Sequence, residues 1–128
     1  MAEAVFDASA VLAMLRDEPG GREADAYVGR AAISAVNLQE VVKELAREGV
    51  GEPEIRSILD ELDVEVVPHD SEAAVHAGLL YRLTKVFGRS LGDRSCMALG
   101  IALGVPVVTT DREWSAVNIE GLDMRLLR

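Results

Sequence analysis

Residues 4–9, Ala4-Val5-Phe6-Asp7-Ala8-Ser9, decide the fold, because they join a short apolar run to an acidic residue and then to a helical pattern. The run from Ala4 to Phe6 is predicted to be a strand. Behind it, Val11, Leu12 and Leu15 recur at helical spacing until Pro19-Gly20-Gly21 stops the helix. A strand that passes directly into a helix is the first unit of an α/β fold.

The same alternation of strands and helices continues along the chain. Apolar spacing predicts further helices around residues 22–28, 38–46, 55–62, 71–83 and 92–103, and further strands at 31–34, 64–67, 106–109 and 124–127. Parallel strands need such crossovers, which are almost always right-handed. The sequence therefore predicts an α/β fold with five strands in a mainly parallel sheet.

Length and composition indicate one domain over residues 1–128. A chain of 128 residues with 49% hydrophobic content is large enough to bury a core. No apolar run approaches 18 residues, which excludes a transmembrane helix, and the acidic Glu3 in a broken apolar start argues against a signal peptide. We therefore expect a cytoplasmic protein with no membrane partner.

Thiol and zinc chemistry have little support in the sequence. Cys96 is the one cysteine, and its neighbours Met97, Ala98 and Leu99 favour a buried small hydrophobe over a nucleophile. The two histidines have no partners at a spacing that would build a zinc site. Trp114 either packs under the fourth strand or stacks on a base, and burial is favoured because aromatic side chains dominate cores.

Four acidic residues stand where an α/β fold would direct them into one pocket. Asp7 and Asp111 follow the first and fourth predicted strands, whereas Glu40 and Asp93 lie early in two predicted helices. Open parallel sheets bind ligands beyond the carboxyl ends of their strands. Four carboxylates together repel one another, and a hard cation such as Mg²⁺ or Mn²⁺ removes that conflict. The pattern predicts a metal site with coordination positions left for a phosphate.

Each acid also has a separate explanation as part of a helix cap. Asp7 suits the N-cap of the helix that follows it. Capping-box patterns occur at residues 37–40, 90–93 and 110–113, and these would account for Glu40, Asp93 and Asp111 one at a time. Capping does not explain why all four acids occupy positions that share one end of the sheet, and this convergence favours the metal site.

Charge complicates a role with nucleic acid. The 22 acidic and 13 basic residues give a net charge of -9, whereas nucleic-acid-binding proteins usually present excess positive charge. Basic residues nevertheless gather in one stretch with Asp93 as the single counter-charge, at Arg82, Lys85, Arg89 and Arg94. This stretch is either a local basic rim beside the acidic pocket or a solvated helix end.

Four blocks of sequence together resemble the PIN-domain family of metal-dependent ribonucleases, and within it the VapC-type toxins of type II toxin-antitoxin pairs. The blocks are Val5-Phe6-Asp7-Ala8-Ser9-Ala10, Ser34-Ala35-Val36-Asn37-Leu38-Gln39-Glu40-Val41, Leu91-Gly92-Asp93-Arg94-Ser95-Cys96-Met97-Ala98-Leu99 and Val108-Thr109-Thr110-Asp111-Arg112-Glu113-Trp114. The resemblance assigns the family's four acids to Asp7, Glu40, Asp93 and Asp111, and its accompanying hydroxyls to Ser9 and Thr110. It implies a three-layer α/β/α fold, a homodimer and a small inhibitory partner. Gly100 departs from the pattern, where alanine would stabilise the helix by about 1 kcal/mol.

The expected reaction is hydrolysis of an RNA phosphodiester. Asp7, Asp93 and Asp111 are expected to hold Mg²⁺ or Mn²⁺, while Glu40 either binds a second ion or orients the attacking water. Arg89 and Arg94 are candidate RNA contacts. The negative charge favours a basic antitoxin as the inhibitory partner.

Two alternatives remain at this stage. The first is a PIN-like binding module without activity. The second is a Mg²⁺-dependent phosphoryl-transfer enzyme of another α/β fold, although the sequence fits its known forms poorly. An aspartyl phosphatase normally carries a second acid two residues after the first, where this chain has Ser9, and a receiver domain needs an aspartate at the end of the third strand, where it has Val67-Pro68.

Overall fold

Five strands form one parallel sheet in the computed structural model, which describes residues 1–85 and 90–127. The strands are β1 (Ala4–Phe6), β2 (Ala31–Ser34), β3 (Glu65–Val67), β4 (Val107–Thr109) and β5 (Met124–Leu126). Their order across the sheet is β3-β2-β1-β4-β5, and each neighbouring pair is parallel. The predicted five-stranded sheet is confirmed. The strand order reverses between β1 and β4, which is where an open parallel sheet forms its ligand crevice.

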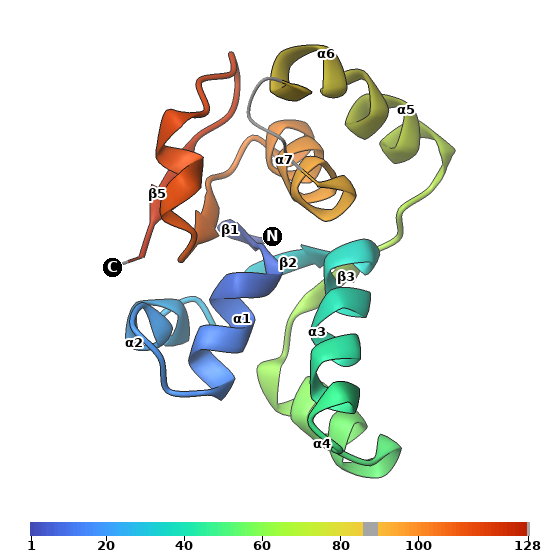
Figure 1. Ribbon diagram of the computed structural model, residues 1–128, viewed down its shortest axis with the longest axis vertical. Coiled ribbons are helices and arrows are strands. Elements are labelled where there is room, and N and C mark those ends of the chain that lie inside the picture. Colours follow the sequence, from blue (N-terminus) through green and yellow to red (C-terminus); the bar gives the residue numbers. More distant parts are fainter. Residues whose placement is uncertain (86–89, 128) are drawn as a thin grey trace.

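Helices cover both faces of this sheet, so the fold has three layers (Figure 1). One face carries α1 (Ala8–Leu15), α2 (Gly21–Asp25), α3 (Ala35–Arg47) and α4 (Glu52–Leu62); the other carries α5 (Ser71–Leu79), α6 (Tyr81–Thr84) and α7 (Leu91–Leu103). A 3₁₀ helix, η2 (Arg112–Ala116), joins β4 to β5. No helix in the described ranges is both long and apolar enough to cross a membrane.

Several helix boundaries differ from the sequence prediction, and two of the differences are informative. The helix expected over residues 71–83 is divided at Leu80 into α5 and α6. α3 begins at Ala35, earlier than predicted, because the Ser34 side chain caps it by accepting a hydrogen bond from the Val36 N–H at 3.2 Å. Asn37 is therefore an interior helical residue, and the interpretation of Asn37 as a helix cap is wrong.

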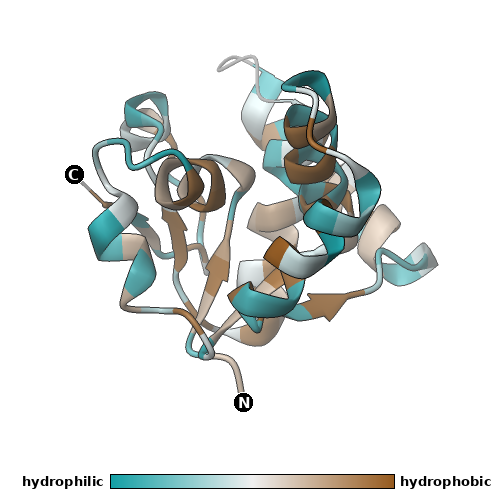
Figure 2. Cartoon of the chain, turned by 90° about the horizontal axis from the view of Figure 1, so that it is seen from below, coloured by the Kyte–Doolittle hydropathy of each residue, from teal (hydrophilic) through white to brown (hydrophobic). Residues whose placement is uncertain are grey.

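Successive side chains of each strand point to opposite faces of the sheet, and they pack into two hydrophobic cores, one on each face. Phe6 and Val108 pack against the α1 to α4 layer, whereas Val5 and Val107 pack against α7. Figure 2 shows hydrophobic residues along the strands, and both hydrophobic and hydrophilic residues on the helices around them. Trp114 is 1% exposed within the second core, which confirms its predicted burial.

Gly100 on α7 has a packing role that its sequence position does not reveal. A Cβ at this position would overlap the Cγ2 atom of Val107, which is fully buried on β4. The absence of a side chain lets α7 approach the sheet closely. The expectation that alanine would stabilise this position is therefore wrong, because it counted helix propensity and left out the strand beneath.

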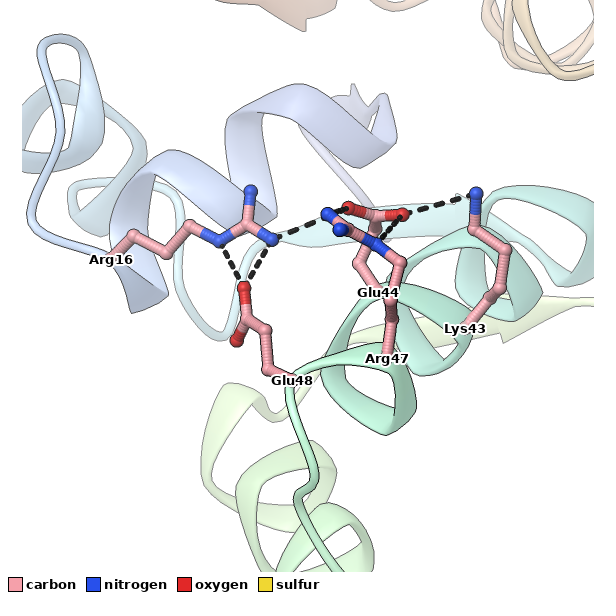
Figure 3. Close-up of polar contacts among 5 residues, drawn as sticks. All are labelled: Arg16, Lys43, Glu44, Arg47 and Glu48. Atoms are coloured by element: carbon pink, nitrogen blue, oxygen red, sulfur yellow. Dashed lines mark hydrogen bonds and ion pairs between the residues drawn. The ribbon is translucent and has the colours of Figure 1, made fainter.

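A surface network of charged side chains joins the end of α1 to the end of α3 (Figure 3). Arg16 donates from Nε to Glu48 Oε1 at 2.8 Å and also from Nη2 to the same oxygen. Glu44 accepts from Arg47 at 2.7 Å and pairs with Lys43 at 3.1 Å, and these cations lower the pKa of Glu44 to about 2. The network links α1, which follows Asp7, to α3, which carries Glu40.

Candidate active site

The ends of two adjacent strands place Asp7 and Asp111 at the same edge of the sheet. β1 and β4 pair in parallel, with Phe6 opposite Val108, and the Asp7 N–H donates to the Val108 carbonyl at 3.3 Å. Asp7 follows β1 directly, and Asp111 lies two residues beyond β4. The position lies at the reversal of strand order, as the sequence pattern predicted.

Asp7 is the most deeply buried of the four acids, with 5% of its surface exposed. It caps α1 by accepting a hydrogen bond from the Ala10 N–H at 2.9 Å, which confirms the capping interpretation. The Ser9 hydroxyl lies 2.8 Å from Oδ1 and 2.9 Å from Oδ2, and the Thr109 hydroxyl donates to Oδ2 at 2.6 Å. The capping hydrogen bond therefore uses Oδ1 of the carboxylate and leaves Oδ2 to other partners.

Burial raises the pKa of Asp7 from 3.8 to about 6. The hydrogen bonds from Thr109, Ala10 and Ser9 oppose this shift, while the negative charge of Asp93 adds to it. Within the described ranges, no lysine or arginine pairs with Asp7. A buried carboxylate that has an acidic neighbour and no cation beside it is suited to a bound cation.

Thr109 is a residue of this pocket that sequence reasoning missed in favour of Thr110. Besides donating to Asp7, its hydroxyl accepts from the Asp111 N–H at 3.0 Å, so it connects two of the acids. Thr110 contributes its backbone N–H to the Ser9 hydroxyl at 3.1 Å, and its Cγ2 methyl lies against Gly20, 2.5 Å from where a Cβ would stand. The available signal was the spacing of Thr109 and Asp111, since a hydroxyl often binds the N–H two residues on.

Glu40 reaches the pocket from the second turn of α3 and lies against the first turn of α7. Its Oε1 accepts from Asn37 Nδ2 at 2.8 Å, and the same nitrogen donates to the Gly92 carbonyl at 2.9 Å. A Cβ on Gly92 would stand only 2.6 Å from both Cδ and Oε2 of Glu40. The Glu40 carboxylate therefore occupies space that only glycine leaves open.

Asp93 is the third residue of α7 and takes part in a capping box. Its Oδ2 accepts from the Ser90 N–H, and its own N–H donates to the Ser90 hydroxyl, both at 3.2 Å. Asp111 is the N-cap of η2, where its Oδ1 accepts from the Glu113 N–H at 3.0 Å. The capping-box interpretation of Asp93 is confirmed. The capping box expected over residues 110–113 is wrong in its details, because Asp111 and not Thr110 is the N-cap. Both acidic side chains remain partly exposed.

Cys96 shows how near three of the acids lie to one another. Burial raises the pKa of its thiol well above the usual range, and the charges of Asp7, Asp93 and Glu40 raise it further. The thiol is fully buried and donates to the Asp93 carbonyl at 3.2 Å, so Cys96 is an inert core residue as predicted. Asp7, Asp93 and Glu40 therefore lie within electrostatic reach of Cys96, although each is held by local hydrogen bonds.

Metal binding would require these side chains to adjust. In the part of the chain that the structure describes, no three acidic, histidine or cysteine side chains stand together in a ready-made metal site. Mg²⁺ keeps several waters and takes only one or two carboxylates, so a complete cage is not needed. The all-oxygen donor set and the uncompensated charge of Asp7 fit a hard cation better than zinc.

The predicted basic rim is only partly described. Arg89 lies outside the described residues. The Arg94 guanidinium lies over the Tyr81 ring at 5.7 Å from its centroid, and Arg82 and Lys85 are exposed. An open cleft of about 300 Å³ adjoins Glu40; its lining includes Gln39, Lys43 and Leu91.

Comparison with known proteins agrees with the fold. A family model described as PIN domain matches residues 4–120. No curated protein matches the chain. The fold is similar to DNA-bound VapBC from Salmonella typhimurium (TM-score 0.74, 19% identity, all of both chains). It is also similar to VapBC2 from Rickettsia felis bound to a promoter DNA fragment (0.73, 15%, 98% of each chain). VapBC-5 from Mycobacterium tuberculosis is similar at 0.59 and 22% identity, over 97% of this chain and 98% of that one. The alternative of a phosphoryl-transfer enzyme with another α/β fold is wrong.

Proposed function

The chain belongs to the PIN domain family, and we propose that it is a metal-dependent ribonuclease that acts as the toxin of a type II toxin-antitoxin pair. The observation that most supports this proposal is the buried Asp7 carboxylate, whose pKa burial raises to about 6. It lies at the reversal of strand order and within the electrostatic reach of Asp93. An ionised carboxylate in such a buried position destabilises the fold, and a bound cation would offset that destabilisation.

Asp7, Asp93 and Asp111 are the proposed ligands of Mg²⁺ or Mn²⁺, with Glu40 as ligand of a second ion or as the group that orients water. When bound, the cation would polarise a phosphoryl oxygen and acidify a water for attack on phosphorus. Ser9 and Thr109 keep the Asp7 carboxylate fixed through hydrogen bonds at 2.6 to 2.9 Å. Because the pKa of Asp7 is about 6, this residue is mostly ionised at neutral pH.

RNA is the proposed substrate, and its contacts would be local. The net charge of -9 opposes long-range attraction of a polyanion. Arg94 on α7, one residue beyond Asp93, is the proposed phosphate contact together with Arg89. The open cleft beside Glu40 would let single-stranded RNA reach this acid. We expect weak binding that depends on the cation.

A small basic antitoxin is the proposed partner, and a cytoplasmic homodimer is the proposed working form. Two of the similar VapBC structures are described as bound to DNA, and a third as a member of a family of toxin-antitoxin systems, which supports a partner of this kind. An arginine or lysine of the antitoxin would neutralise Asp7 and Asp93. Replacing both with asparagine should then weaken antitoxin binding, and unchanged affinity would remove this mode of inhibition.

The test is RNA cleavage by purified protein, free of contaminating nuclease, on a mixed RNA pool with Mg²⁺ or Mn²⁺. Cleavage should stop with EDTA and in the Asp7→Asn variant, while Asp60→Asn, an exposed change on α4, should leave it intact. Cleavage that persists in Asp7→Asn would exclude this site. If neither cleavage nor metal binding occurs, the protein is the silent binding module instead.

A further inference from the structure

We infer that Asn37 is a positioning residue, which fixes the Glu40 carboxylate against the first turn of α7. This inference deepens the proposed function and rests on it. Asn37 is 1% exposed and lies within α3, where Ser34 already caps the helix end. Neither capping nor solvent contact explains a polar side chain at this position.

The Asn37 carboxamide joins two helices at the point where Glu40 sits. Its Nδ2 donates to Glu40 Oε1 at 2.8 Å on its own helix and to the Gly92 carbonyl at 2.9 Å on α7. The two N–H groups of one nitrogen point in fixed directions, so the two acceptors are held in a fixed relation. The carboxylate of Glu40 is thereby aligned with the turn that carries Asp93.

Gly92 completes this arrangement by leaving room for the carboxylate. A Cβ there would stand 2.6 Å from Glu40 Cδ and Oε2, which is too close for any stable contact. Oε1 is engaged by Asn37, whereas Oε2 accepts no hydrogen bond from the residues that the structure describes. Asn37 therefore binds one carboxylate oxygen of Glu40 and leaves the other available to a water or a cation.

The remaining polar atom of Asn37 indicates that packing alone does not account for the residue. Its Oδ1 is buried and has no hydrogen-bond partner within residues 1–85 and 90–127. Leaving a buried acceptor unpaired is unfavourable, and an apolar side chain such as leucine would avoid that cost. The useful part of this side chain is its pair of N–H donors, one of which holds Glu40 within α3 while the other binds Gly92 on α7.

NMR of the side-chain amides tests this geometry without any cleavage assay. The chain has only three side-chain carboxamides, at Asn37, Gln39 and Asn118. In Glu40→Gln, both N–H signals of Asn37 should shift and exchange faster with water, while those of the exposed Asn118 stay unchanged. Asn37 signals that do not respond to Glu40→Gln would overturn the inference.

A double-mutant cycle on RNA cleavage tests the functional consequence. Asn37→Asp keeps the shape but removes both donors, and kcat should fall about 10- to 100-fold with little change in KM. In the Glu40→Gln background, Asn37→Asp should cause no further loss, because its effect passes through Glu40. Equal losses in both backgrounds would indicate a purely structural role. Asn118→Asp is the matched control and should keep wild-type kcat.

Asn37→Leu is a second variant, which keeps the test valid if Asn37→Asp does not fold. It removes the unpaired Asn37 Oδ1 and adds no charge to the interior, so the variant should stay folded while losing kcat to the same extent. Wild-type kcat in folded Asn37→Leu would contradict the inference. If the wild-type protein cleaves no RNA, the proposed function fails, and the NMR comparison still decides whether Asn37 holds Glu40.

Discussion

Replacing Gly92 with alanine should separate activity from stability. The added Cβ would stand 2.6 Å from Glu40 Cδ and Oε2, whereas carbon atoms normally pack at about 3.5–4.0 Å. The Glu40 carboxylate must therefore move by roughly 1 Å. It belongs to a flexible, partly exposed side chain, so the movement itself is inexpensive.

The expected change in stability is small because two effects oppose each other. Alanine is favoured over glycine in a helix by up to about 1 kcal/mol. Displacing Glu40 breaks its 2.8 Å hydrogen bond with Asn37, which costs about 0.5–1.5 kcal/mol. The free energy of unfolding should therefore change by no more than about 1 kcal/mol in either direction. A change of that size would shift Tm by about 2–8 °C.

Activity should respond far more strongly to the same change. A displacement of about 1 Å in a catalytic group can reduce the rate about 100-fold. We therefore expect Gly92→Ala to be folded and to cleave RNA about 100-fold more slowly at saturating metal. The measurements are Tm by circular dichroism and kcat on a single-stranded RNA. Wild-type kcat in a folded Gly92→Ala protein would refute the placement of Glu40 in the site.

Three further predictions concern stability. Gly100→Ala should lower the free energy of unfolding by about 0–2 kcal/mol in urea titrations. Overpacking against Val107 costs about 1–3 kcal/mol, whereas the higher helix propensity of alanine contributes about 1 kcal/mol. A clear gain in stability would show that α7 and β4 are not tightly packed there. Because burial raises the pKa of Asp7 from 3.8 to about 6, protonation of Asp7 contributes stability below pH 3.8 that is lost as the pH rises through 6. Metal-free Asp7→Asn should thus be more stable than the wild type near pH 7 by up to about 3 kcal/mol, and the advantage should disappear near pH 4; a constant difference across this range would contradict the shifted pKa. The cations around Glu44 lower its pKa from 4.5 to about 2, so its contribution is present above pH 4.5 and lost toward pH 2. The urea midpoints of wild type and Glu44→Gln should converge over that interval, and parallel curves would show that the network does not stabilise the fold.

Much of the fold follows from local pattern in the sequence. The strands β1 and β4 are short apolar runs between turn signals, and α7 has a clear helical spacing, so their type and order were predictable. The placement of Asp7 and Asp111 follows from the same pattern, because residues after adjacent parallel strands must share one edge of the sheet. The beginning of α3 was misplaced because Ser34 belongs to the strand and caps the helix as well.

The finer geometry of the site depends on contacts between distant residues. Thr109 lies 102 positions from Asp7. The choice between Thr109 and Thr110 is decided by which of the two hydroxyls faces Asp7. The role of Asn37 depends on the Gly92 carbonyl, 55 residues away. Gly100 has the same explanation: helix propensity favours alanine, but the closeness of Val107 favours glycine. Such preferences arise from tertiary packing, which local propensity does not contain.

Binding of Mn²⁺ to the purified protein tests the central claim, that these acids form a cation site, most directly. Calorimetry or electron paramagnetic resonance near neutral pH should detect binding by the wild type and by Asp60→Asn. Affinity should fall steeply in Asp7→Asn and Asp93→Asn, because each removes a carboxylate charge from the pocket. Equal binding by all four proteins, or no binding by any, would contradict the account.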